Sequence, residues 1–218
     1  MFTGIITGVG RIAAVHALGS SSHGKRLTIT CPAGYLDDVA LGDSIALNGA
    51  CMTVTTFDAA AGQFTIDISA ESLDKTTGLD TEGPINLEKA MRPNDRLGGH
   101  LVSGHVDGVG TVSHFASVGE SWELRVLAPQ SLGKFLAYKG SIVINGVSLT
   151  VNRVQDVRQD DGTVRSTEVS INLIPHTIEN TALHALSAGS RVNLEIDLIA
   201  RYVERMLTAP AANVASSH

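Results

Sequence analysis

The chain contains two copies of one sequence pattern, and this duplication restricts its fold more than any other feature. Residues 1–10 read MFTGIITGVG and residues 101–110 read LVSGHVDGVG, so that three glycines and a valine coincide at a shift of 100 residues. At a shift of 97, residues 44–54 match residues 141–151, and the run Asn-Leu-Glu closes both copies. A repeat of about 100 residues is domain-sized, whereas solenoid repeats span only about 20 to 50. We therefore expect two related domains, each with a core of its own.

Each copy is predicted to form a small antiparallel β-barrel. Short runs rich in Val, Ile and Thr alternate with Gly, Pro and Asn, as is typical of strands separated by turns. The strands expected in the first copy are 2–15, 25–30, 43–47, 51–57, 63–69 and 85–88. Asn48-Gly49 and Asn145-Gly146 predict tight turns, because both residue types tolerate positive φ. The expected fold class is all-β, with two tandem six-stranded antiparallel barrels at residues 1–92 and 98–196.

The end of the chain has no counterpart in the first copy. Apolar residues recur at helical spacing within residues 197–208, and they are Leu198, Ile199, Tyr202, Val203, Met206 and Leu207. This apolar stripe can pack on its own barrel or on the same helix of a neighbouring subunit, and we favour a helix for oligomerisation. Residues 209–218, rich in Ala and Ser, predict a disordered tail.

Composition excludes several classes of protein. A formal net charge of -6 and 4% aromatic residues argue against a nucleic-acid-binding surface, which needs basic and stacking side chains. No apolar run approaches the length of about 18 residues that spans a bilayer, and the first residues lack the basic start of a secretory signal. We expect a cytoplasmic protein without a membrane partner, in which the two cysteines, Cys31 and Cys51, are reduced.

Several blocks of the chain resemble the riboflavin synthase family, in the family's own order. These blocks are MFTGI, NGACMTV, GGHLVSGHVDG, INGVSLTV, LIPHTIENT and NLEID followed by YVERML, and together they cover roughly residues 1–207. The resemblance implies two similar Greek-key barrels, each a lumazine-binding repeat, and a C-terminal helix. It also implies a homotrimer in which the N-terminal barrel of one subunit faces the C-terminal barrel of its neighbour.

The activity implied by this resemblance is a dismutation. Two molecules of 6,7-dimethyl-8-ribityllumazine exchange a four-carbon unit to give riboflavin and 5-amino-6-ribitylaminouracil, and neither a metal nor an organic cofactor is required. A duplicated chain suits this chemistry, because two related half-sites can hold two identical molecules face to face. A carrier that binds lumazine or flavin without turnover is the alternative. A flavin-dependent reductase would bring a nucleotide-binding domain with a G-x-G-x-x-G turn, and no such motif follows the barrels.

Positions that differ between the copies are candidates for unlike roles of the two bound molecules. The differing pairs are Ile5 and His105, Cys51 and Ser148, Glu71 and His176, and Ala90 and Asp197. Deprotonation of a substrate methyl group needs a base, and attack on the second molecule needs a nucleophile or a proton relay. The candidate catalytic residues are His105, Cys51, Ser148, Asp197, Ser44 and Thr150.

Each candidate also has a structural interpretation. His105 fits a buried core histidine, Cys51 a small core residue, and Asp197 the N-cap of the final helix. His100 lies five residues before His105, on the opposite face of an extended segment, so we expect no two-histidine metal site. Asn145 stands where many family members carry Asp, and an amide cannot take up a proton as a carboxylate does.

Candidate binding residues fall into two sets. The set expected around the N-terminal barrel is Gly4, Ile5, Ile6, Ala50, Cys51, Met52, Thr53, Asp67, Ile68, Ser69, Ala70, Glu71 and Ser72. The set expected around the C-terminal barrel is Gly104, His105, Val106, Lys139, Asn145, Ser148, Leu149, Thr150, Asn172, Leu173, Ile174, Pro175, His176 and Thr177. Backbone groups are expected to supply much of the contact with the pyrimidine-dione edge, and the equivalent residues Thr53 and Thr150 suit hydrogen bonds to a ring edge in both sites.

Overall fold

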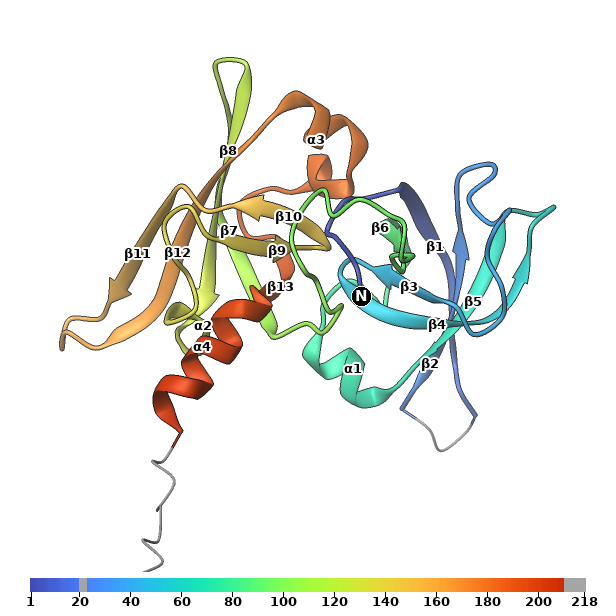
Figure 1. Ribbon diagram of the computed structural model, residues 1–218, viewed down its shortest axis with the longest axis horizontal. Coiled ribbons are helices and arrows are strands. Elements are labelled where there is room, and N and C mark those ends of the chain that lie inside the picture. Colours follow the sequence, from blue (N-terminus) through green and yellow to red (C-terminus); the bar gives the residue numbers. More distant parts are fainter. Residues whose placement is uncertain (20–22, 210–218) are drawn as a thin grey trace, which may run out of the picture.

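Two β-rich units lie side by side in the computed structural model, which describes residues 1–19 and 23–209 of the chain (Figure 1). The first unit runs from the N-terminus to about residue 90, and the second ends in a C-terminal helix. The predicted all-β class, the two repeats and the helix are therefore confirmed. The predicted tail lies outside the described residues except for Ala209.

The first unit is a closed six-stranded barrel with the strand order β1-β2-β5-β4-β3-β6. Its elements are β1 Gly8–Ala17, β2 Lys25–Thr30, β3 Ser44–Leu47, β4 Ala50–Asp58, β5 Gln63–Ile68, α1 Ala70–Lys75 and β6 Gly83–Lys89. Along β4, Met52 and Val54 are buried while Thr53 faces solvent, as the two-residue period of a strand requires. Asn48 and Gly49 have positive φ of 45° and 85°, which confirms the predicted tight turn between β3 and β4.

The second unit is a curled seven-stranded sheet rather than the closed six-stranded barrel expected, with the order β10-β9-β13-β7-β8-β12-β11. Its elements are β7 Gly108–Val118, β8 Ser121–Pro129, α2 Gln130–Gly133, β9 Ser141–Ile144, β10 Val147–Thr150, β11 Arg153–Arg158, β12 Val164–Leu173, α3 Pro175–Asn180, the 3-10 helix η1 Ala182–Ala185, β13 Arg191–Ile196 and α4 Leu198–Thr208.

The extra strand comes from a break in the segment equivalent to β4, at Val151 and Asn152. Val151 donates its N–H to the carbonyl of Gly140 (2.9 Å), as its counterpart Val54 does to the carbonyl of Asp43 (2.9 Å), so this bond does not distinguish the two units. In the first unit the same place is a bulge just after Val54, and β4 remains continuous through it. The two units therefore share one plan, with a stronger interruption in the second.

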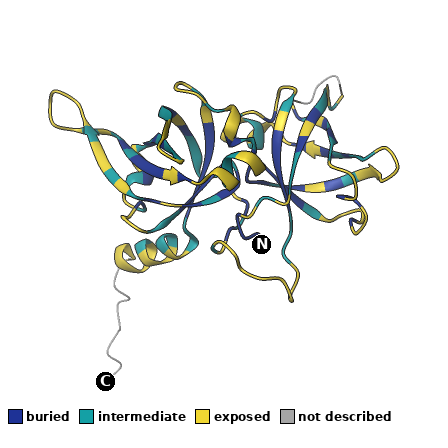
Figure 2. Cartoon of the chain, turned by 90° about the horizontal axis from the view of Figure 1, so that it is seen from above, coloured by how far each residue is buried: buried dark blue, intermediate teal, exposed yellow. Residues whose placement is uncertain are grey.

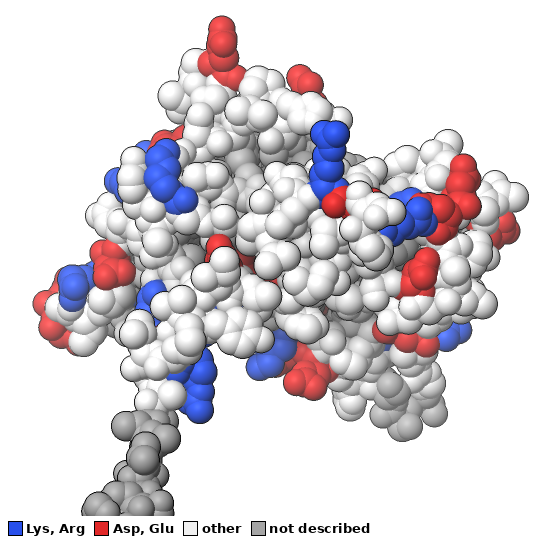
Figure 3. Space-filling model, viewed as in Figure 1, with Lys and Arg blue, Asp and Glu red and all other residues white. Residues whose placement is uncertain are grey.

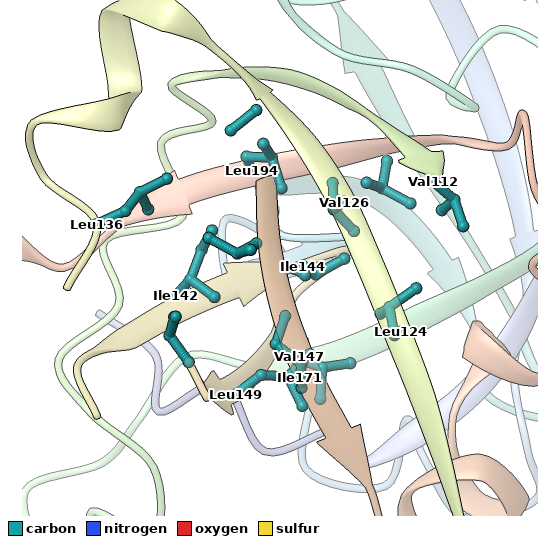
Figure 4. Packing of buried hydrophobic residues seen from close by; sticks show 14 of the residues in the cluster. Val112, Leu124, Val126, Leu136, Ile142, Ile144, Val147, Leu149, Ile171 and Leu194 are labelled. Carbon is teal, nitrogen blue, oxygen red and sulfur yellow. The ribbon is translucent and has the colours of Figure 1, made fainter. Parts of the chain in front are cut away.

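Each unit has its own hydrophobic core. In the second unit, side chains from facing strands meet inside the curled sheet, and ten of them are labelled in Figure 4. The residues of this core with at most 2% of their surface exposed are Val112, Leu124, Val126, Ala128, Ile142, Ile144, Val151, Val169, Ile171, Leu173, Leu183, Val192, Leu194 and Ile196. The first core is built in the same way around Leu27, Phe64 and Leu87. The expectation of two separate cores is confirmed.

The two units meet through reciprocal contacts. Phe2 and Val102 exchange two backbone hydrogen bonds of 2.8 and 3.1 Å and, with Ala46, belong to a small buried cluster between the units. The turns also touch, because a Cβ atom added to Gly49 would lie 2.9 Å from the backbone nitrogen of Gly146. Only glycine allows this approach at positive φ.

Buried asparagines complete the contact between the units. The Asn86 side chain donates to the carbonyl of Asn145 (2.8 Å), and the Asn193 side chain donates to the carbonyl of Asn48 (3.1 Å). Asn193 also accepts from the backbone N–H of Thr77 at 2.7 Å. Because these polar groups are buried, their hydrogen bonds hold the two barrels in one relative position.

Helix α4 projects from the second unit and leaves its apolar face uncovered (Figure 2). Its exposed apolar residues are Ile199, Tyr202, Val203, Met206 and Leu207, which are 43% to 81% exposed. The alternative in which the stripe packs on its own barrel is therefore wrong for this chain. No helix among the described residues has both the length and the apolar character needed to cross a membrane.

Candidate functional site

The glycine-rich segments that start each copy cross over to the opposite unit. We call residues 2–6 the first strap and residues 102–106 the second strap. The N–H of Ser148 donates to the carbonyl of Gly4, and the N–H of Cys51 donates to the carbonyl of Gly104, both at 2.8 Å. Ile6 of the first strap packs against the second core, and Val106 of the second strap packs against the first. The predicted grouping of each strap with its own barrel is therefore wrong.

Two buried carboxylates hold the straps in place. Glu88 accepts hydrogen bonds from the N–H and hydroxyl of Thr3, both at 2.7 Å, and from the N–H of Gly4 at 3.0 Å. Glu195 binds the second strap with the same three bonds, at 2.6, 2.7 and 3.0 Å. Burial raises the pKa of both carboxyl groups, and these hydrogen bonds oppose the rise. Sequence analysis did not identify Glu88 and Glu195. Their occurrence at equivalent places inside two apolar strands is the signal from which this role could have been predicted.

The first half-site consists of β4, the junction of β5 with α1, and the second strap. Cys51 is half-buried, and a Cβ atom added to Gly104 would lie 2.7 Å from its Cβ, so strap and strand are in direct contact. His105 follows Gly104 and is exposed. The predicted residues placed here are Ala50, Cys51, Met52 and Thr53 on β4, Asp67 and Ile68 on β5, and Ser69, Ala70, Glu71 and Ser72 around the start of α1, together with Gly104, His105 and Val106.

Not every side chain in this set is free to meet a ligand. Ala50, Met52 and Ile68 are buried in the first core, which leaves only their backbone groups for a ligand. Asp67 forms a two-pronged ion pair with Arg26 at 2.7 and 2.8 Å, and this guanidinium lowers the pKa of the Asp67 carboxyl.

The second half-site is the counterpart built on the second unit and completed by the first strap. The predicted residues placed here are Ser148, Leu149 and Thr150 on β10, Asn172 and Leu173 on β12, and Ile174, Pro175, His176 and Thr177 around the start of α3, together with Gly4, Ile5 and Ile6. Ser148 and Thr150 lie on one face of β10, while Leu149 between them is buried. Lys139 lies in the loop before β9, where its Nζ donates to Asn152 Oδ1 (3.1 Å).

The second half-site contains a histidine that sequence reasoning did not assign to it. His100 Nδ1 lies 2.7 Å from Ser148 Oγ, and its Nε2 is buried without a hydrogen-bond partner among the described residues. Burial lowers the pKa of His100, while the charge of Asp197 opposes this shift, so the ring is neutral at pH 7. Asp197 accepts from the N–H of Ile199 (2.9 Å), which confirms its predicted role as the N-cap of α4. The first half-site has Ala90 in place of Asp197.

Two further candidates have contacts beyond these clusters. Asn145 accepts from the N–H of Asn193 within the second unit through its side chain (2.8 Å), and its backbone carbonyl accepts from the Asn86 side chain of the first unit (2.8 Å). Ser44 on β3 pairs with Thr53 on β4 and lines a cavity of about 600 Å³ in the first unit. This cavity is lined by Thr3, Ile5, Thr7, Asp38, Val39, Asp43, Ser44, Ile45, Glu88, Lys89, Ala90, Met91, Arg92, Asp95, Arg96 and Gly98. It shares only Ile5 and Ser44 with the predicted site residues.

The charges and metal-binding residues define the surface chemistry further. Basic and acidic side chains are interspersed on the face shown in Figure 3, in contrast to the basic stripe of a nucleic-acid-binding protein. Among residues 1–19 and 23–209, no group of three or more His, Cys, Asp and Glu side chains is placed to hold a metal ion.

Two equivalent half-sites, each made of one barrel and the strap of the other, define a duplicated β-barrel protein that binds small molecules. The lumazine binding domain family matches twice, at residues 3–90 and 103–197. The chain belongs to the riboflavin synthase family, whose members are transferases. It is 41% identical over 221 residues to the riboflavin synthase of Actinobacillus pleuropneumoniae, covering 100% of this chain and 95% of the relative.

Other relatives agree with this assignment. The chain is 43% identical over 209 residues to the riboflavin synthase of Bacillus subtilis strain 168, covering 95% of this chain and 90% of the relative. Among solved structures, LumP complexed with 6,7-dimethyl-8-(1'-D-ribityl) lumazine is similar with a TM-score of 0.72 and 26% identity. That match covers 89% of this chain and 98% of LumP. LumP complexed with riboflavin is similar with a TM-score of 0.74.

Proposed function

We propose that the protein catalyses the dismutation of two 6,7-dimethyl-8-ribityllumazine molecules into riboflavin and 5-amino-6-ribitylaminouracil. The observation that carries this proposal is the pair of half-sites, which share one frame but present different reactive groups. Identical substrates bound in such sites meet different surroundings, so one can donate the four-carbon unit and the other can accept it. The two products together contain all the atoms of the two substrates, so the reaction needs no oxidant and no cofactor.

The second half-site supplies the stronger proton-transfer machinery. With its own proton on Nε2, neutral His100 accepts the hydroxyl proton of Ser148 across 2.7 Å. Ser148 can then take a proton from the acidic methyl group at C7 of a bound lumazine or deliver an activated oxygen to the ring. The charge of Asp197 stabilises the imidazolium that forms.

The remaining candidates bind and orient the rings. Thr53 and Thr150 are exposed at equivalent places on β4 and β10 and suit hydrogen bonds to the ring edges. Cys51 and His105 lie together in the first half-site, where they can serve as nucleophile and proton relay for the second substrate. Ser44, next to Thr53 across the ladder, extends the polar edge of this half-site. Lys139, Asn172 and His176 belong to the outer wall of the second half-site, and Asn145 acts through the contact between the units.

Assembly brings two half-sites together in this proposal. Residues 1–92 and 98–196 are the two lumazine-binding domains, and residues 197–208 form the oligomerisation helix of a homotrimer in the cytoplasm. The N-terminal barrel of one subunit then faces the C-terminal barrel of its neighbour across the two substrates. The exposed apolar face of α4 supports this assembly, since such a face is stabilised by burial against other subunits. Deletion of residues 198–207 should give monomers with strongly reduced turnover, measured by sedimentation and by product formation.

A second candidate function is a carrier that binds lumazine or flavin without converting it. The likeness to LumP favours this alternative, because LumP is similar over nearly its whole length. Against it stands the cluster of Ser148, His100 and Asp197, which a passive carrier does not need.

The deciding experiment uses the purified protein and the lumazine alone, without added metal or nucleotide. We expect one riboflavin and one 5-amino-6-ribitylaminouracil for every two lumazines consumed, followed by absorbance and chromatography. Tight binding of the lumazine without any riboflavin at saturating substrate would overturn the enzyme proposal and establish the carrier.

A further inference from the structure

We propose that Asp107 and Arg201 are positioning residues that clamp the junction between β13 and α4 and so hold Asp197 in the second half-site. The inference rests on the proposed function, because it assigns a supporting role to residues around Asp197. Among the described residues, neither side chain forms a hydrogen bond with the half-site strands β4, β5, β10 and β12. They act through the backbone on either side of Asp197.

The clamp has one carboxylate and two partners. Asp107 Oδ2 accepts from the N–H of Ile196 (2.9 Å), the residue before Asp197. Asp107 Oδ1 accepts from the guanidinium of Arg201 (2.5 Å), one helical turn after Asp197. Arg201 also donates its backbone N–H to the carbonyl of Asp197 (3.2 Å). Asp197 is therefore enclosed between two contacts to the same side chain.

The environment makes this contact effective. Only 13% of the Asp107 side chain is exposed, so the ion pair with Arg201 is shielded from water on one side. Asp107 is itself anchored, because its N–H donates to the carbonyl of Leu194 at 2.8 Å. It also follows His105 by two residues, which links the end of the second strap to the start of α4.

The first unit shows what the same fold does without the clamp. Thr7 occupies the place of Asp107, and its hydroxyl donates to the carbonyl of Leu87 at 3.2 Å. Ala90 occupies the place of Asp197, and the chain continues there into the linker at residues 91–99 instead of a helix. Carboxylate, guanidinium and helix therefore occur together in one copy and are absent together from the other. This joint occurrence indicates that the three act together to hold Asp197 in position.

The position of Asp197 matters because its charge acts on His100, the partner of Ser148. The interaction of a carboxylate with a neighbouring imidazole weakens as the distance between them grows. Apart from the clamp and the N-cap, the ion pair between Lys134 and Glu204, near the other end of α4, is the one side-chain hydrogen bond that joins α4 to the rest of the described chain. Without the clamp, Asp197 would be free to turn away from His100.

The test compares Asp107→Thr, which installs the residue of the first unit, with Arg201→Gln and the control Lys134→Gln. The control removes the other ion pair between α4 and the barrel but leaves the surroundings of Asp197 intact. We expect kcat for riboflavin formation to fall at least tenfold in the first two variants, with KM changed less than twofold and with Lys134→Gln at the wild-type level. Arg201→Lys should recover most of the lost kcat.

A second readout does not depend on turnover. In the NMR titration of the His100 imidazole, both clamp variants should shift the pKa of His100 to lower pH, since Asp197 no longer favours the charged ring. Unchanged titration and kcat in a folded Arg201→Gln protein would overturn the proposal, as would equal losses in Lys134→Gln. If Asp107→Thr does not fold, Arg201→Gln, at a partly exposed helix position, decides alone. If the wild type makes no riboflavin, the titration still tests the clamp, so the two failures are distinguishable.

Discussion

The first and second units agree where they are buried and differ where a ligand can reach them. Glu88 and Glu195 each hold a strap with three hydrogen bonds of nearly the same lengths, and the asparagines between the units occupy equivalent positions. By contrast, Cys51 is replaced by Ser148 at the half-site surface, and Ala90 is replaced by Asp197. The two copies therefore share their buried contacts and differ in the reactive groups at their half-sites.

A physical reason underlies this division. A buried polar group left without a partner costs about 1–3 kcal/mol. A change at Glu88 would therefore have to be matched in the first strap, and a change at Asn86 on the opposite unit. At the exposed half-sites a side chain can change without such a penalty. Substitutions at the buried contacts, at the half-sites and at the surface test this contrast between the units, and those at the buried contacts should have the largest effects.

Substitution of the touching glycines should destabilise both units alike. Gly49→Ala and Gly146→Ala each place a Cβ 2.9 Å from a backbone nitrogen across the interface, at a φ above 80°. We expect each to lower the free energy of unfolding by about 3 kcal/mol, from overpacking and from the left-handed conformation together. Gly119→Ala is the control, since its φ is +59° but no atom lies within 4 Å, and it should cost about 1 kcal/mol. Urea unfolding measures all three, and equal costs would show that the close contact is unimportant.

Removal of the reactive groups should lower kcat by different amounts in the two half-sites. Ser148→Ala loses the partner of His100, so we expect kcat to fall about 100-fold, the size of a lost proton-transfer group. Cys51→Ala should reduce kcat only about tenfold, because the described residues place no imidazole at hydrogen-bond distance from this thiol. Steady-state kinetics with the lumazine measures both. A larger loss in Cys51→Ala would assign the main proton transfer to the first half-site.

The asparagines of the interface should differ slightly between the units. Asn193 makes three side-chain contacts across the interface, to Thr77 N, Thr77 O and Asn48 O, whereas Asn86 makes two. We expect Asn193→Ala to lower the free energy of unfolding by about 3 kcal/mol and Asn86→Ala by about 2 kcal/mol. Asn94→Ala, on the exposed linker, should leave stability unchanged. The reverse order in thermal unfolding would contradict the predicted asymmetry.

The smallest effect concerns the surface ion pairs in acid. Arg125 beside Glu123 lowers the pKa of that carboxyl to about 2, and Arg26 lowers the pKa of Asp67 in the first unit. Because the folded pKa lies below the unfolded value, this stability is present above about pH 4.5 and is lost as the pH falls toward 2. Exposed pairs contribute at most about 1 kcal/mol. Glu123→Gln should therefore lower Tm slightly at pH 6 and by less at pH 2.5, with a smaller change for Asp67→Asn, and 1 M salt should reduce both differences.

Much of the fold could be predicted from local sequence. The period of two in β4, the Asn-Gly turns and the helical spacing of α4 each depend on residues close together in the chain, so their structures follow from propensity and burial. The interruption at Val151 and Asn152 was missed, because both residue types are compatible with a continuous strand. The bonds of Val151 to the preceding loop do not explain it, because Val54 makes the equivalent bonds in the continuous strand β4.

The candidate site was only partly predictable, and the reason lies in the duplication itself. Comparison of the copies identified Ser148, Cys51 and Asp197 as places where the halves differ. The two glycine-rich straps, however, are alike in sequence, so the sequence does not show which unit each strap contacts. Only the tertiary structure decided that the straps are exchanged and that His100 meets Ser148. Such contacts join residues that are far apart in the chain, such as Gly4 and Ser148, and they exist because the two units dock in one relative position fixed by buried polar groups.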